Sequence, residues 1–426
     1  MHILLLAHGS RGDVQPIMAL GRGLQQAGYT VTVASGKNFK QRIERAGFHY
    51  APFSADMQAV LNSPEGLDWI EKSSRNPAVG IKFMRDLMDR EGPQTNRDLL
   101  EIIESLQQVD AVVSGLTLFP VTEAICEQRG ILHVRAMFVP MKPTRHPEVS
   151  IFPYFPWGPS PLNQLAGYAG AYFLWTVAKD NCNTLREQLG LEKWGYRDYV
   201  RAWNHTPTLY GLSIHATPPA DDWPGHNAVT GYWFWDDHEG WTPSPELLAF
   251  LQSGPPPVYV GFGSMKKRDP AGTLKIVIDA LQQTGQRGII SEGWAKMGGD
   301  DLPETIFTIT DVPHTWLFPQ MAGVVHHGGA GTTAAGLRAG VPATIVAHMA
   351  DQPYWGRRTV ELGVAPTFIP LHEFTTPRLV AAIQRMVTDS NMKQQATALS
   401  KKIQAETGVS NAVAALHKML KTPDEQ

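Results

Sequence analysis

The chain has 426 residues, of which 43% are hydrophobic and 18% are charged, a composition that excludes a disordered protein and allows two or three globular domains. The formal net charge of −3 argues against a nucleic-acid binder that relies on overall positive charge. The two cysteines, Cys126 and Cys182, occur in no zinc or redox spacing, so we expect a protein of the reducing cytoplasm. Since no apolar run approaches the about 18 residues of a membrane-spanning helix, any membrane contact is expected to be peripheral.

The first half of the chain alternates short apolar runs with amphipathic segments. HILLLA at residues 2–7 predicts a buried parallel strand, which the loop HGSRGDVQP and a helix over about 17–27 follow. YTVTVAS predicts the next strand, and about 40–46 the next helix. Further on, LLEIIESLQQVD leads into AVVSG as a helix followed by a strand. This rhythm indicates a doubly wound parallel sheet.

Residues 140–175 break the alternation, because they are dense in proline and aromatic residues. One interpretation is a hydrophobic insertion that serves packing alone. The other is a set of loops that forms a wall for an apolar ligand beside the sheet. The aromatic residues that we single out for such an acceptor wall are Phe138, Tyr154, Phe155, Trp157, Tyr172 and Trp175.

A second alternation follows a segment rich in proline and glycine. VYVGFGS, RGIIS, TIFTIT, GVVHHG and VPATIVA predict strands, and PAGTLKIVIDALQQTG and TTAAGLRAG predict helices between them. The last fifty residues read as helices. We therefore expect an N-terminal α/β domain over 1–235, a linker over 236–256, a second α/β domain over 257–405, and a C-terminal helix over 406–426.

The stretch GVVHHGGAGTTAAGLRAG at residues 323–340 has three interpretations: a metal site, a tight packing turn, or a cradle for phosphate. Successive side chains of a strand point to opposite faces, and no carboxylate lies nearby, so the histidine pair is a poor metal chelator. The glycines let a ligand approach the backbone, and the threonines open a helix whose free N–H groups attract anions. The stretch lacks the GK[ST] ending of a P-loop.

Two other loops follow strands of the same predicted sheet. Asp351 and Gln352 come after VPATIVA, and GFGS at 261–264 ends VYVGFGS. Since the carboxyl ends of parallel strands share one edge, we expect these loops to converge with the glycine-rich turn on one crevice.

These residues resemble the donor signature of family 1 glycosyltransferases with the GT-B fold, in the branch of the sterol 3-beta-glucosyltransferases, which includes glycopeptide-antibiotic and rhamnolipid glycosyltransferases. The stretches that carry the resemblance are GSRGDVQP (9–16), VTGYWFWDD (229–237), VYVGFGSM (258–265) and HHGGAGTTAAGLRAGVP (326–342) with DQPYWGRR behind it. The resemblance implies two Rossmann-like domains that face each other across a cleft, with C-terminal helices that cross back. It also implies inverting transfer of a hexose to a hydroxyl, with a nucleotide sugar, expected to be UDP-glucose, as co-substrate and without a metal or other cofactor.

The resemblance also assigns donor-binding roles. His327 would bind the pyrophosphate with Gly329, Gly331 and Thr332, while Asp351 and Gln352 would hold the sugar. Ser264 would reach a phosphate, the backbone around Val312 would read the base edge, and Trp294 would stack on the base unless it is a core residue. Ala335 stands where plant members carry a ribose-binding glutamate, which leaves the choice between uridine and thymidine diphosphate open.

The first loop supplies the candidates for the general base that accepts the hydroxyl proton, His8 and Asp13. The resemblance favours Asp13, which stands three residues before Pro16, although an N-cap role for Asp13 is the structural alternative. Ser10 and Arg11 are expected to face the donor phosphates.

The expected acceptor is a bulky apolar alcohol such as a sterol, triterpenoid or polyketide. The alternatives are a GT-B nucleotide-sugar epimerase or hydrolase, and a non-catalytic lipid-binding module with this fold. A Rossmann dehydrogenase is disfavoured, because neither first strand is followed by the glycine fingerprint. The sequence predicts no nucleic-acid partner and leaves the oligomeric state open.

Overall fold

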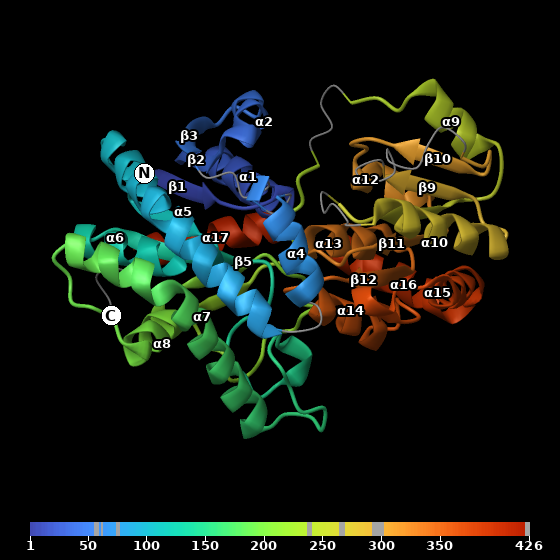
Figure 1. Cartoon of the computed structure of the whole chain (residues 1–426). Helices are drawn as coiled ribbons and strands as arrows, with labels where there is room; N and C mark the ends of the chain where they lie inside the picture. Colours follow the sequence, from blue (N-terminus) through green and yellow to red (C-terminus); the bar gives the residue numbers. More distant parts are fainter. Residues whose placement is uncertain are drawn as a thin grey trace. The chain divides into compact units, whose positions relative to one another are not determined.

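The computed structural model describes residues 1–54, 59–60, 63–73, 77–236, 241–263, 269–291 and 302–421. The chain forms two compact units (Figure 1). The first consists of Met1–Ala59, Ala78–Trp235 and Glu406–Gln426, and the second of Val60–Pro77 and Asp236–Ala405. Among the described helices, none is both long and apolar enough to cross a bilayer.

The first unit is built on a seven-stranded parallel sheet with the order β3-β2-β1-β4-β5-β6-β7. Its strands are β1 (His2–Ala7), β2 (Thr30–Gly36), β3 (His49–Phe53), β4 (Ala111–Ser114), β5 (Leu132–Met137), β6 (Thr208–Tyr210) and β7 (Asn227–Val229). The chain proceeds outward from β1 in one direction and from β4 in the other. The carboxyl ends of these two neighbours are therefore the switch point at which ligands bind in such sheets.

The helices of the first unit cover both faces of this sheet. They are α1 (Arg11–Gln26), α2 (Lys40–Arg45), α5 (Pro77–Ser105), α6 (Phe119–Arg129), α7 (Pro161–Gln188), α8 (Tyr196–His205) and α17 (Gly408–Lys421), with short 3-10 turns η1 (Lys37–Phe39), η2 (Leu116–Leu118) and η3 (Pro147–Val149). Successive residues of β1 alternate between two cores: Leu5 packs with α1 and α17, while Leu4 and Leu6 pack with α5 and α6. Burial on both faces explains why this strand is an unbroken apolar run.

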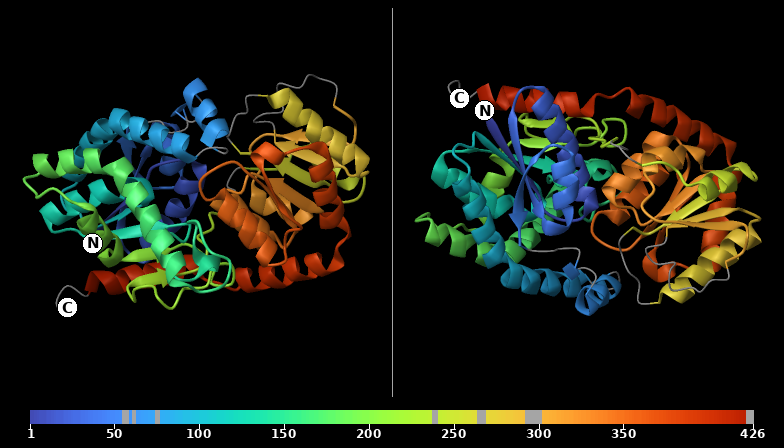
Figure 2. Two further views of the ribbon diagram at one scale, coloured as in Figure 1. Left: turned by 60° about the horizontal axis from the view of Figure 1, so that its bottom comes forward. Right: turned by 90° about the horizontal axis from the view of Figure 1, so that it is seen from above.

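The C-terminal helix α17 lies beside α1 on the first unit (Figure 2). The two helices approach closely at Gly23, where a Cβ atom would lie 2.4 Å from Cγ1 of Val409. The start of α17 packs backbone to backbone, since a Cβ at Gly408 would lie 2.2 Å from the carbonyl oxygen of Tyr232. Asn411 completes the attachment by donating from Nδ2 to the carbonyl of Thr230 at 2.9 Å. The predicted return of the chain's last helix to the first domain is confirmed.

The second unit has a six-stranded parallel sheet with the order β10-β9-β8-β11-β12-β13. Its strands are β8 (Val258–Gly261), β9 (Gly288–Ser291), β10 (Ile306–Ile309), β11 (Gly323–His326), β12 (Ala343–Ala347) and β13 (Phe368–Pro370). Its helices are α4 (Pro64–Ser73), α9 (Pro245–Gln252), α10 (Pro270–Gln283), α12 (His314–Leu317), α13 (Ala330–Ala339), α14 (Gln352–Glu361), α15 (Thr376–Thr388) and α16 (Ser390–Gln404), with η4 (Phe318–Gln320) and η5 (Leu371–Glu373). Two doubly wound α/β domains are thus present, as predicted.

Two segments differ locally from the sequence expectation. The helix expected from residue 17 begins already at Arg11, because Ser10 and Asp13 form a capping box at its start. Part of the expected linker over 236–256 is the helix α9, because Ser244 caps it by accepting a hydrogen bond from the Leu247 N–H at 3.2 Å.

Candidate functional site

The switch point of the second sheet lies between β8 and β11. β11 ends at His326, which is in register with Gly261 of β8 and Ile345 of β12. The turns after β8 and β11 therefore leave the sheet side by side at its carboxyl edge. The glycine-rich turn of the sequence lies where an open α/β sheet binds its ligand.

The helix α13 starts directly after this turn and has no side-chain cap. Gly329 is its N-cap residue, and the first backbone bond runs from the Thr333 N–H to the Gly329 carbonyl at 2.9 Å. The amides of Ala330, Gly331 and Thr332 belong to the first turn, where N–H groups have no acceptor within the helix. Together with the positive end of the helix dipole, these amides can bind an anion.

The glycines of the turn are required by close packing. Gly328 has a φ of +89°, and a Cβ there would lie 2.5 Å from Cγ2 of Ile345. A Cβ at Gly329 would lie 2.7 Å from Nε2 of His327, and one at Gly263 would lie 3.0 Å from Cε1 of the same ring. The imidazole of His327 is thus held between the turn after β8 and the start of α13.

The two adjacent histidines have different environments. Their ring centroids are 6.4 Å apart and the planes cross at 88°. His326 is fully buried, and its Nδ1 accepts a hydrogen bond from the Gly328 N–H at 3.1 Å, so this ring shapes the turn. Nδ1 of His327 is buried without a hydrogen-bond partner among the residues that the structure describes. Burial lowers the pKa of His327 to about 4, so the ring is neutral near pH 7 and can donate an N–H to a phosphate oxygen.

Asp351 and Gln352 follow β12 at the start of α14. The buried Gln352 accepts at Oε1 from the N–H groups of His348 at 2.7 Å and Met349 at 3.1 Å, which fixes the loop after the strand. Asp351 accepts at Oδ2 from Nε1 of Trp355 at 3.1 Å. Both predicted sugar-binding residues thus also hold the loop together.

The other predicted donor residues are spread along the same edge. Val312 follows β10, half-buried against the core, after Asp311 with a φ of 52°. The predicted phosphate contact Ser264 and the predicted base contact Trp294 lie outside the described residues. Ala335 lies on the buried side of α13.

In the first unit, His8 follows β1 at the switch point of that sheet. Its ring packs edge-to-face on Phe53, with centroids 5.4 Å apart. Neither ring nitrogen has a hydrogen-bond partner in the described part of the chain. Burial lowers the pKa of His8 to about 4, against the opposing charge of Asp98. His8 is therefore a neutral imidazole near pH 7.

Asp13 lies in the first turn of α1, where it caps the helix together with Ser10. Its Oδ2 accepts from the Ser10 N–H at 2.7 Å and from the Ser10 hydroxyl at 2.9 Å. A Cβ at Gly9 would lie 2.4 Å from that oxygen. Although Asp13 reaches solvent, desolvation by the surrounding protein raises its pKa against the hydrogen bonds from Ser10. The N-cap role that we considered for Asp13 belongs to Ser10, and the exposed Arg11 is the first residue of the helix.

The six predicted acceptor residues are divided among separate packing groups. Phe138 packs on Trp233 with centroids 5.4 Å apart, and the buried Trp175 stacks on Tyr199 at 5.2 Å. Phe155 and Trp157 stack on each other, Tyr172 packs on Tyr196, and Tyr154 is half-buried. The prediction that all of them lie on loops is wrong for Tyr172 and Trp175, which lie on α7 because Ser160 caps a 28-residue helix there.

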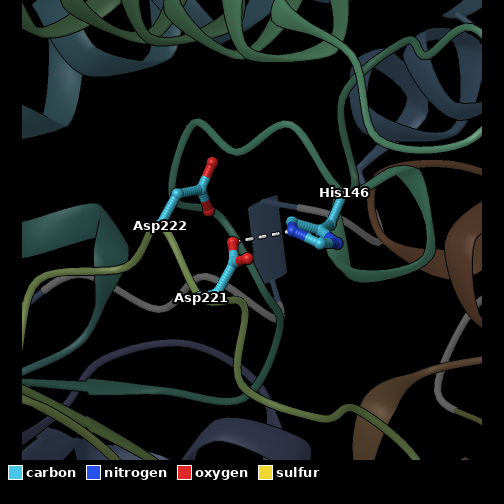
Figure 3. A group of neighbouring side chains, drawn as sticks. All are labelled: His146, Asp221 and Asp222. Atoms are coloured by element: carbon cyan, nitrogen blue, oxygen red, sulfur yellow. Dashed lines mark hydrogen bonds and ion pairs between the residues drawn. The ribbon is translucent and has the colours of Figure 1, made fainter.

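Figure 3 shows a further group, His146, Asp221 and Asp222, whose nitrogen and carboxylate oxygens are close enough together to hold a metal ion. The atoms already have partners, however. His146 Nε2 is 2.9 Å from Asp221 Oδ1, and Asp222 accepts from the Thr144 hydroxyl at 2.6 Å and the Arg145 N–H at 2.8 Å. The Arg145 guanidinium also lies 3.7 Å from Asp222. We interpret the group as a clamp between two loops.

Sequence reasoning missed a chain of three hydrogen-bonded polar side chains inside the first unit. The Ser114 hydroxyl is 2.7 Å from Nε2 of His133, whose Nδ1 bonds Glu123. The order resembles a catalytic triad, but Ser114 has no exposed surface, so no substrate reaches it. Burial alone would raise the pKa of Glu123, and the bond and charge of His133 reverse this to a lowered pKa. These residues come from three elements, so only the fold joins them.

The fold and site define the class of protein: a two-domain α/β protein with an uncapped helix start at the switch point of its second sheet. Residues 3–117 match the glycosyltransferase family 28 N-terminal domain, and residues 277–419 match the erythromycin biosynthesis protein CIII-like C-terminal domain.

Relatives cover the whole chain. It is 34% identical over 441 residues to a sterol 3-beta-glucosyltransferase of Arabidopsis thaliana, which covers 99% of this chain and 68% of that protein. It is 32% identical over 430 residues to the O-mycaminosyltylonolide 6-deoxyallosyltransferase of Streptomyces fradiae, covering 99% and 98%. The solved structure of the kitacinnamycin glycotransferase superposes with a TM-score of 0.72 at 18% identity, covering 98% of each chain, and shows the shared fold.

The chain belongs to the GT-B glycosyltransferases, in the branch of the sterol 3-beta-glucosyltransferases. It is therefore a glycosyltransferase, and the predicted fold class and family are confirmed.

Proposed function

We propose that this glycosyltransferase transfers glucose from UDP-glucose to a hydroxyl group of a sterol or another bulky apolar alcohol, with inversion to the beta-glycoside and without a metal. The observation that carries the proposal is the uncapped start of α13 beside the neutral ring of His327. A helix start of this kind binds phosphate groups, and the expected donor of this family is a nucleotide sugar. We therefore infer that the anion bound there is a nucleoside diphosphate.

The donor diphosphate would bind to the first-turn amides of α13, with an N–H of His327 on a phosphate oxygen. During transfer the bond between the anomeric carbon and the diphosphate breaks, and negative charge grows on the leaving group. Fixed N–H dipoles stabilise that charge without reorganisation, which is the largest contribution in many enzymes. Asp351 and Gln352 would contact the sugar hydroxyls from the neighbouring strand end.

Asp13 would act as the general base. The acceptor oxygen attacks the anomeric carbon on the side opposite the diphosphate, a new C–O bond forms, and the hydroxyl proton passes to the Asp13 carboxylate. A carboxylic acid is far more acidic than an alcohol, so the proton moves late, as the C–O bond forms. The bonds from Ser10 to Oδ2 orient the carboxylate for this role.

The two relatives give contrasting substrates. One is a glucosyltransferase of sterols, and the other a 6-deoxyallosyltransferase of O-mycaminosyltylonolide. We favour glucose and a sterol, because the sterol enzyme is more similar in sequence. Ala335 leaves no ribose-binding glutamate on α13, so uridine and thymidine diphosphate sugars both need to be tested.

The test is a panel of UDP- and TDP-sugars against sterols, triterpenoids and macrolides, with product mass and anomeric configuration determined. We expect a sterol beta-glucoside from UDP-glucose, with the rate unchanged by EDTA. Hydrolysis or epimerisation of the donor in the presence of every acceptor would favour the epimerase or hydrolase alternative. Sterol binding without turnover of any donor would favour a non-catalytic lipid-binding module.

A further inference from the structure

A continuous part of the first unit carries no charged side chain. The thirty residues from Val149 to Ala178 include no aspartate, glutamate, lysine, arginine or histidine. The segment nevertheless exposes large apolar side chains, which we call the apolar face: Phe155 (39% exposed), Trp157 (82%), Leu162 (49%), Leu165 (64%) and Tyr172 (54%). Single exposed apolar residues are ordinary, but a group of this size marks an interaction site.

The apolar face has a defined geometry. Leu162, Leu165 and Tyr172 follow one another on α7 at spacings of three and seven residues, which places them on one side of the helix. Phe155 and Trp157, in the loop before the helix, stack with centroids 5.8 Å apart. In Figure 1 the first turns of α7 and this loop extend beyond the sheet of the first unit.

The loop before α7 satisfies much of its backbone internally. Asn163, only 1% exposed, accepts at Oδ1 from the Phe155 N–H at 2.6 Å and donates from Nδ2 to the carbonyls of Arg145 and Gly158 at 3.0 and 3.1 Å. The Ser160 N–H donates to the Arg145 carbonyl at 2.9 Å. A loop that enters an apolar environment needs such internal partners, because unpaired backbone groups are costly there.

The charges that anchor this loop lie outside the uncharged segment. Asp222 holds the backbone N–H of Arg145, and His146 pairs with Asp221 (Figure 3). The clamp fixes the loop's base at residues 144–146, while the loop tip and the part of α7 up to Ala178 present only neutral groups. A protein interface is usually completed by a polar rim with about ten hydrogen bonds. A bilayer interface instead favours tryptophan and tyrosine, whose amphipathic rings lie at the level of the headgroups.

We propose that the apolar face docks on the surface of a lipid bilayer of low net charge, such as phosphatidylcholine, with Trp157, Leu162 and Leu165 inserted at the headgroup boundary. The charge pattern carries this choice, because no charged side chain of the face has to be desolvated. The proposal builds on the proposed function, since a sterol-type acceptor is dissolved in the bilayer. Docking would place the enzyme at the source of its acceptor.

The first experiment measures binding of the full chain to phosphatidylcholine vesicles by co-sedimentation, with and without added sterol. The wild type is expected to bind, and Leu162→Ser/Leu165→Ser to bind at least about tenfold more weakly, because the variant loses the apolar surface of two inserted leucines. The matched control Ile214→Ser removes a side chain of the same unit that is 46% exposed outside the face, and it should bind like the wild type. Raised salt should leave binding unchanged.

The second experiment uses tryptophan fluorescence with brominated phosphatidylcholine. Quenching is expected in the wild type and should be lost in Trp157→Ser, whereas unchanged quenching would contradict insertion. No vesicle binding by the wild type, or equal binding of the leucine variant, overturns the proposal. A dimer that the leucine variant abolishes, without vesicle binding, identifies the face as a contact between copies and also overturns it.

Activity on a sterol delivered by cyclodextrin separates this proposal from the proposed function. The leucine variant should retain that activity while losing activity on sterol in vesicles. Vesicle binding by a protein that glucosylates no acceptor would refute the proposed function and leave docking intact. Loss of activity on the cyclodextrin-delivered sterol would assign the leucines to the acceptor site and overturn docking.

Discussion

The starts of α1 and α13 differ in what faces their free backbone N–H groups. Each helix follows a switch-point strand, β1 or β11, through a loop with histidine and glycine. At α1 the chain supplies its own anion, the Asp13 carboxylate bonded to Ser10. At α13 the N-cap is Gly329, which has no side chain to fill the position. The same helix end is therefore closed by a carboxylate in one domain and open to an external anion in the other.

The largest expected effect comes from Asp13→Asn. If the carboxylate is the base, glucoside formation should fall about 10³-fold, within the 10² to 10⁴ that general base catalysis contributes. Nucleoside diphosphate affinity, measured by calorimetry, should stay within about twofold of the wild type. An equal loss of turnover and affinity would refute the role, and a comparable loss of turnover in His8→Gln, with Asp13→Asn active, would transfer it to His8.

Making α13 resemble α1 should remove donor binding. Gly329→Asp places a carboxylate at the open helix start, where it repels a diphosphate, and we expect affinity to fall about 100-fold. Gly329→Asn has nearly the same shape without the charge, and it controls for the contact with His327. If both variants bind equally, the helix start does not hold the diphosphate. His327→Ala should weaken donor affinity about tenfold, by loss of one hydrogen bond to a charged group.

The histidines of both loops predict how stability depends on pH. Burial lowers the pKa of His8 and of His327 to about 4, below the 6.5 of an unfolded chain. Between these values the unfolded state binds protons that the folded state does not, so stability falls as the pH drops from 6.5 towards 4. Although ring nitrogens of both histidines are buried, each residue as a whole is only half-buried, so solvent screens part of the effect. We therefore expect each histidine to account for about 1 kcal/mol of the free energy of unfolding that is lost.

Urea unfolding at several pH values measures this effect. Between pH 7 and pH 5, His8→Gln should lose less of its free energy of unfolding than the wild type loses. His327→Gln should also lose less than the wild type. Identical slopes in the wild type and both variants would show that neither ring contributes.

The smallest expected effect tests the capping box. Ser10→Ala removes the hydroxyl bond to Asp13 but keeps the backbone bond, and it should lower the free energy of unfolding by about 0.5 to 1 kcal/mol. Thermal unfolding measures the loss. Turnover should fall only severalfold, because the carboxylate remains oriented by the Ser10 N–H. A stability unchanged by this substitution would show that the hydroxyl bond is not formed.

The strand β1 and the glycine-rich turn around His327 could be predicted from the sequence, because each depends on residues that are close together in the chain. An apolar run such as HILLLA buries both faces of a parallel strand, and the glycines around His327 are needed within a few residues of the turn that they form. The exposure of the aromatic residues was not readable. Trp157 and Trp175 belong to the same aromatic segment, yet one is 82% exposed and the other 5%.

The sequence alone determined the two doubly wound domains, the glycine turn before α13 and the family, since all of these follow from periodicity and from residues adjacent in the chain. Only the tertiary structure decided that Ser10 and Asp13 form one capping box, that Gln352 fixes the loop after β12, and that Ser114, His133 and Glu123 meet. The reason is physical. Local sequence limits the backbone to a few conformations, whereas a side chain's partner and exposure depend on which distant element covers it.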